Sequence, residues 1–226
     1  MIPSQAPSQP YFFEASLQLG TNPSNAMNVE AVPFELPYDD SNSLEENLEI
    51  WYCGGSVGCN EANTNTQPDG LQANNDKGIT IALLQDPDGN LYLVLIYGSG
   101  NGSGGRATVT TSGNGVDGNS GINGLVYADD GGEGGSFPTD VSWRWVDGKT
   151  DGFIVAVNTP NTTSSQEICY EHTSLTNIEN LRFVPAKNDP SDPNARSVLG
   201  VPVSIVAEDR NAILDELFCI RLSSVT

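Results

Sequence analysis

The segment from Ile79 to Tyr97 most constrains what this chain can fold into. Two apolar runs, ITIALLQ and NLYLVLIY, are joined by the turn Asp86-Pro-Asp-Gly89. Proline at the second position and glycine at the fourth are typical of a tight reversal. Both runs are apolar on both faces instead of alternating with polar residues. Because such strands lie at the centre of a sheet covered on both sides, the sequence predicts a buried β-hairpin.

The rest of the chain has the organisation of one all-β domain. Short apolar blocks alternate with long loops rich in Gly, Asp and Asn along 226 residues. This spacing predicts a two-sheet β-sandwich with jelly-roll-like character over residues 11–226, after an N-terminal arm at residues 1–10. Expected strands include Tyr11–Leu19, Asn47–Cys53 and a second hairpin between Val141 and Asn158. No apolar run reaches the ~18 residues of a membrane span.

The charge of the chain limits its partners. The sequence has 29 acidic and 9 basic residues, for a net charge of −20. Such a surface repels phosphates and anionic lipids, which argues against nucleic-acid and membrane-surface binding. Two interpretations of the acidity stay open: solubility, or oxygen ligands for Ca²⁺ on glycine-rich turns. The candidate calcium ligands are Asp117, Asp129, Asp130, Glu133, Asp140, Asp147 and Asp151.

The four cysteines are expected to form two disulfides, and of the three possible pairings the preferred one is Cys53–Cys59 with Cys169–Cys219. Cys53 and Cys59 close the short loop CGGSVGC, while Cys169 and Cys219 lie in two strand-like runs. A structural zinc site would need CxxC spacing or a histidine cluster, and the chain has neither. An even cysteine count without metal spacing favours disulfides over buried thiols. It therefore indicates an oxidising location, either extracellular, on a cell surface or on a virion surface.

The tryptophans have two interpretations. Trp143 and Trp145 are two residues apart, so they share one face of a strand. On an exposed face these rings, or Trp51, would form a stacking platform for a sugar. Inside the sandwich Trp143 and Trp145 would pack against Phe153, and the usual burial of large aromatic side chains favours this core interpretation.

No motif in the chain identifies a family or an active site. The single histidine, His172, is expected at the surface or hydrogen-bonded within a strand. Gly100–Gly105 fits G-x-G-x-x-G but precedes a β-like run rather than the helix that would hold a pyrophosphate. A carboxylate-dependent glycan hydrolase needs two positioned acids, and nothing marks out such a pair.

The sequence as a whole predicts a non-enzymatic structural or adhesive subunit. We expect a secreted, calcium-stabilised protein that forms homo-oligomers, filaments or shells when its N-terminal strand adds to a neighbour's sheet. The alternative is a carbohydrate-binding module with a glycan partner, and the weakest alternative is the glycan hydrolase.

Overall fold

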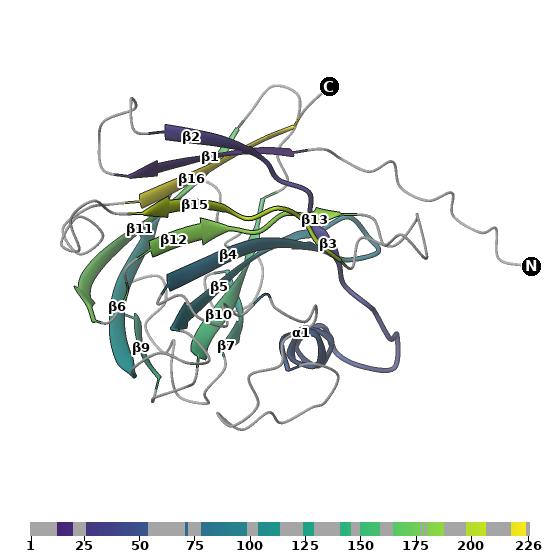
Figure 1. Cartoon of the computed structure of the whole chain (residues 1–226). Coiled ribbons are helices and arrows are strands. Elements are labelled where there is room, and N and C mark those ends of the chain that lie inside the picture. Colours follow the sequence, from purple (N-terminus) through teal and green to yellow (C-terminus); the bar gives the residue numbers. More distant parts are fainter. Residues whose placement is uncertain are drawn as a thin grey trace, which may run out of the picture.

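The computed structural model shows two β-sheets packed face to face (Figure 1). It describes residues 13–19, 26–53, 71, 78–98, 104–113, 124–128, 141–145, 150–158, 165–176, 178, 180–187, 198–206 and 218–224. The predicted arm at residues 1–10 lies outside these ranges. The two-sheet sandwich predicted from the sequence is confirmed.

Six of the described strands form sheet A. In spatial order they are β2 (Ala26–Glu30), β1 (Phe13–Leu19), β16 (Phe218–Ser224), β11 (Gln166–Leu175), β6 (Gly105–Ser112) and β9 (Val141–Trp145). Every neighbouring pair in this sheet is antiparallel. Strand β1 is paired on both sides, with β16 and with β2, so it belongs to the interior of its own sheet.

Sheet B contains seven strands within the part of the chain that the structure describes. Along its main path they are β15 (Val203–Val206), β12 (Asn180–Phe183), β4 (Gly78–Gln85), β5 (Leu91–Gly98), β10 (Thr150–Val157) and β7 (Leu125–Ala128). Strands β12 and β3 (Phe34–Glu35) share the outer side of β4 and both run parallel to it. A small separate ribbon joins β13 (Ala186–Lys187) to β14 (Val198–Leu199).

The predicted hairpin is the centre of sheet B. Strands β4 and β5 are in continuous antiparallel register from Gly78–Gly98 to Gln85–Leu91. Gly89 takes a φ of 88°, the left-handed conformation that glycine adopts without steric cost. The Asp86 carboxylate accepts hydrogen bonds from the Asn90 amide N–H and from the Tyr92 hydroxyl, both at 2.8 Å, and these bonds hold the turn.

Both faces of the hairpin are buried, as the sequence predicts, because sheet B is the middle layer of three. Leu93 and Ile81 face sheet A across the main core. Val94 and Leu84 face a second core, built from residues of helix α1 (Leu44–Tyr52) and the surrounding segments. Figure 1 shows α1 beside β7 and β10, on the side of sheet B away from sheet A. The hairpin is apolar on both faces because each face packs against one of these two cores.

Helix α1 replaces a predicted strand. Asn47–Cys53 alternates in polarity, but these residues form the second half of α1 and its C-cap, so the strand prediction was wrong. Ser43 and Glu46 form a reciprocal capping box, in which each side chain accepts a hydrogen bond from the other residue's backbone N–H. Such a box starts a helix by satisfying amides that otherwise have no partner. The buried face of α1 then follows helical spacing through Leu48, Trp51 and Tyr52.

The second predicted hairpin is also wrong. Strand β9 pairs with β6 in sheet A, whereas β10 pairs with β5 and β7 in sheet B. The short connection from Trp145 to Thr150 therefore crosses between the sheets instead of reversing within one. From β5 to β12, successive described strands alternate between the two sheets. A short loop in the sequence fits either a hairpin within one sheet or a connection between two sheets, because both join strand ends that lie close together.

Candidate functional site

The predicted calcium ligands lie mostly outside the described residues. This holds for Asp117, Asp129, Asp130, Glu133, Asp140 and Asp147. Within the described ranges, no group of three or more His, Cys, Asp or Glu side chains is arranged to hold a metal ion. Calcium binding therefore remains a prediction for the glycine-rich segments, and Asp151 is the one candidate ligand whose surroundings are defined.

Asp151 connects the two sheets from inside the sandwich. It lies on β10 in sheet B, and only 2% of its surface is exposed. Its Oδ2 accepts a hydrogen bond of 2.7 Å from the backbone N–H of Arg144 on β9, which ends the described strand order of sheet A opposite β2. The carboxylate thus satisfies a backbone donor that points away from β6, the sheet partner of β9. This contact gives Asp151 a structural role in joining β9 to sheet B.

His172 and Tyr97 form a second polar contact between the sheets. The Tyr97 hydroxyl oxygen and His172 Nε2 are 3.2 Å apart, and the two rings meet edge to face with centroids 5.8 Å apart. His172 is 4% exposed, so the prediction of a hydrogen-bonded strand residue is confirmed and the surface position is wrong. Tyr97 and Asp151 are register partners on β5 and β10, which places all three polar side chains at one end of the core.

Burial determines the charge state of this cluster. It lowers the pKa of His172 from 6.5 to about 4, so the imidazole is neutral at neutral pH. It also raises the pKa of Tyr97, with a smaller contribution from the nearby Asp151 carboxylate. Burial raises the pKa of Tyr170 as well. A neutral imidazole and two protonated phenols in the core act here as hydrogen-bonding and packing groups.

The tryptophan side chains that are described lie in the cores. Trp143 is fully buried, and its ring stacks on Phe153 with centroids 4.5 Å apart, which confirms the core interpretation for this residue. Trp51 is 3% exposed and packs near Phe34 in the second core. Trp145 ends β9, and its side chain lies outside the description. Neither described ring presents a face to solvent, as a sugar platform requires.

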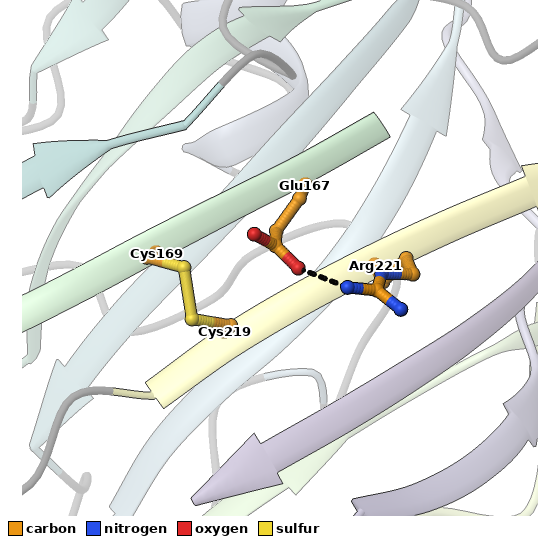
Figure 2. A network of polar contacts seen from close by, with 4 residues as sticks. All are labelled: Glu167, Cys169, Cys219 and Arg221. Atoms are coloured by element: carbon orange, nitrogen blue, oxygen red, sulfur yellow. Dashed lines mark hydrogen bonds and ion pairs between the residues drawn. A yellow bond between two sulfur atoms is a disulfide. The ribbon is translucent and has the colours of Figure 1, made fainter. Parts of the chain in front are cut away.

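The disulfide between Cys169 and Cys219 is confirmed. The two residues are register partners on β11 and β16, at the centre of sheet A. Figure 2 shows the bridge beside the Glu167–Arg221 ion pair, two residues away on the same strands. Ile168 and Ile220 point into the core, so both cross-strand pairs lie on the outer face of sheet A. Cys53 is also disulfide-bonded, and its predicted partner Cys59 lies outside the described residues.

The outer face of sheet A has a charge pattern that the sequence analysis missed. Arg106 on β6 is the register partner of Arg144 on β9, and Glu14 on β1 is the register partner of Glu30 on β2. All four side chains are exposed. No local motif reveals these pairs, because they depend on the register between strands from distant parts of the chain.

Comparisons of this chain with protein-family models, with curated proteins and with solved structures found no match. Among the described helices, none has the length and apolar character needed to cross a membrane.

Proposed function

We propose that this chain is a non-enzymatic structural or adhesive β-sandwich subunit that acts outside the cytoplasm. The observation that carries the proposal is that three side chains of types common in active sites are buried between the two sheets. His172, Tyr97 and Asp151 are each at most 4% exposed. They connect sheets A and B instead of lining an open site. Contacts of this kind hold the two sheets together, which suits a protein with a structural role.

The disulfide supports a location outside the cytoplasm. Cys169–Cys219 links two neighbouring strands that already pair through their backbones. Disulfides persist in oxidising compartments and are rare where thioredoxin and glutathione keep thiols reduced. The net charge of −20 also keeps such a protein soluble at high local concentration. An extracellular, cell-surface or virion-surface position agrees with both features.

Calcium remains part of the proposal and has its own test. A ligand that binds only the native state stabilises it by about 2.7 kcal/mol at one hundred times its dissociation constant. Thermal melts in excess EDTA and in millimolar Ca²⁺, with light scattering recorded in parallel, are expected to show a higher midpoint with calcium. Greater scattering with calcium would add support for calcium-driven assembly. Identical midpoints would contradict calcium binding and leave the acidic loops as solubilising segments.

Assembly by strand addition is restricted by the position of β1. Since Phe13–Leu19 is paired on both sides within its own sheet, the proposed donor segment is residues 1–10. Deletion of residues 2–10 keeps β1 in place, whereas a longer deletion would remove an interior strand. The test compares the mass of both proteins in solution by light scattering. We expect the full chain to form larger species than the shortened chain, and equal masses would rule out the arm as the donor.

A further inference from the structure

The outer face of sheet A carries two pairs of like charges at diagonally opposite corners. Arg106 and Arg144 face each other across β6 and β9, at one edge of the sheet. Glu14 and Glu30 face each other across β1 and β2, at the other edge. We call them the arginine pair and the glutamate pair.

The register places the pairs on one face but at opposite ends of the strands. Ala107 and Trp143 point into the core, so their neighbours in the arginine pair point outward. Ala15 and Val29 place the glutamate pair outward in the same way. The arginine pair lies level with Thr176, just beyond the C-terminal end of β11. The glutamate pair lies level with Ser223 of β16, beyond the N-terminal end of β11.

Like charges directly opposite each other on neighbouring strands destabilise a sheet, whereas opposite charges stabilise it. The centre of the same face follows the favourable rule, because Arg221 and Glu167 are register partners with an N–O distance of 2.6 Å. At the two edges of this sheet, by contrast, the residues that face each other carry like charges. Within the described residues, no ion pair or hydrogen bond reaches the guanidinium groups of the arginine pair or the carboxylates of the glutamate pair; Arg106 and Arg144 form hydrogen bonds with side chains only through their backbones.

The two pairs cannot neutralise each other within one molecule. Four strand spacings separate them across the sheet, which is roughly 20 Å before the offset along the strands is counted. Exposed charges are screened over about 8 Å at physiological ionic strength. The charges within each pair therefore repel each other, and no side chain among the described residues compensates them.

We propose that the outer face of sheet A is a self-association surface, on which the arginine pair of one copy binds the glutamate pair of another. This inference rests on the proposed role as an assembling subunit. Because the pairs occupy diagonal corners of one face, a twofold axis in the plane of contact brings both arginine pairs onto both glutamate pairs at once. A guanidinium presents N–H donors in a planar fork that matches a carboxylate, so each contact combines charge with geometry.

A second copy fits this face better than another anion. A small anion or an acidic glycan would compensate the arginine pair and leave the glutamate pair uncompensated. The face next to the arginine pair is also hydrogen-bonding rather than apolar, since Thr108 Oγ1 and Ser142 Oγ lie 3.0 Å apart in the adjacent row. A surface of this kind suits a polar, salt-sensitive contact between soluble subunits.

The test exchanges the charges between corners. The variant Arg106→Glu/Arg144→Glu carries glutamates at both corners, and Glu14→Arg/Glu30→Arg carries arginines at both. Sedimentation velocity at low salt is expected to show a dimer for the unaltered protein and monomers for each variant alone. An equimolar mixture of the two variants is expected to restore the dimer, because each then meets its opposite. Circular dichroism melts confirm that every variant is folded.

Control variants separate the position of the charges from the net charge. Asp40→Arg/Glu45→Arg makes the chain less negative, as Glu14→Arg/Glu30→Arg does, and Lys187→Glu makes it more negative by half as much as Arg106→Glu/Arg144→Glu. Both controls change exposed residues outside sheet A, and they are expected to leave the dimer unchanged. If both corner variants associate like the unaltered protein, this inference fails while assembly by another surface stands. If only the arginine-corner variant loses association and the mixture of variants does not form a dimer, the arginine pair binds another anion and the inference also fails. An unaltered protein that is monomeric under every condition would overturn both the inference and the proposed assembly.

Discussion

The ring of Trp143 in sheet A stacks on the ring of Phe153 in sheet B, with centroids 4.5 Å apart and an interplanar angle of 12°. Phe153 also contacts Tyr97 and Tyr170, with centroid separations of 6.2 Å for each pair. This aromatic cluster joins the two sheets at the end of the sandwich where Asp151 and His172 make their polar contacts. The aromatic packing and the polar contacts of Asp151 and His172 therefore stabilise the same interface between the sheets.

Replacement of Trp143 by alanine should remove much of this interface. Truncation of a fully buried tryptophan typically costs about 3–5 kcal/mol, because apolar contacts are lost and a cavity remains. Urea unfolding followed by circular dichroism measures the change. Val201→Ala is the control, since Val201 is 82% exposed and its truncation should have little effect. Equal stability of the two variants would contradict the assigned position of Trp143.

The stability of the protein should fall with pH in a way that depends on His172. Its pKa is about 4 in the folded chain and near 6.5 when exposed. Between these values the unfolded chain binds the proton first, so each decrease in pH through this window favours unfolding. The contribution is complete above pH 6.5 and is lost as pH falls toward 4. Over the whole window it is on the order of 3 kcal/mol.

The variant His172→Gln isolates this effect from the titration of carboxylates. Glutamine keeps a polar side chain but does not titrate, so the variant should lose less stability than the unaltered protein between pH 6.5 and 4. The measurement is the free energy of unfolding in urea across this range for both proteins. Parallel pH profiles would show that His172 is not a buried neutral imidazole.

Removal of the disulfide should destabilise the sandwich without changing its fold. The cysteines are separated by 50 residues, and the cross-link restricts the unfolded chain. We expect Cys169→Ala/Cys219→Ala to lose about 2–4 kcal/mol, measured by urea unfolding. Arg221→Ala on the same strand is the control, because an exposed ion pair contributes at most about 1 kcal/mol. A double variant no less stable than this control would contradict the assigned contribution of the disulfide.

The like-charge corners predict a substitution that stabilises the isolated chain. Arg144→Glu places a glutamate opposite Arg106 and should raise the free energy of unfolding by about 0.2–1 kcal/mol. Arg221→Glu is the matched opposite, because it places a glutamate opposite Glu167 and should lower stability. Both effects should shrink at high salt. Urea midpoints at two ionic strengths, measured on monomeric protein, test the pair. Changes of the same sign in both variants would contradict the cross-strand register.

Local patterns predict the parts of this fold whose causes are local. The turn chemistry of Asp86–Gly89 and the apolar runs beside it specify the central hairpin and its two buried faces. The alternation of Leu48, Ile50 and Tyr52 predicts a strand at Asn47–Cys53, whereas the capping residues Ser43 and Glu46 immediately before it favour the helix that forms. Here the competing helical signal was present in the sequence.

Other features depend on contacts between distant segments and have no local signature. The crossing between β9 and β10, the contact of Asp151 with Arg144, and the two like-charge pairs all follow from strand order and register. The Cys169–Cys219 disulfide is an exception, because the sequence predicts it. The short loop between Cys53 and Cys59 favours a bridge between those two, which leaves Cys169 and Cys219 to pair with each other. Calcium binding stays a prediction, since all of the expected ligands except Asp151 lie outside the described residues.

The mass of the unaltered, oxidised protein in solution is the most direct test of self-association. Sedimentation equilibrium over a wide range of protein concentration, at low and at high salt, measures that mass. An assembling subunit held by the charged corners of sheet A should form a dimer whose population rises with concentration and falls with salt. The mass of one chain at every concentration and both salt levels would contradict the proposal that this protein is an assembling structural subunit.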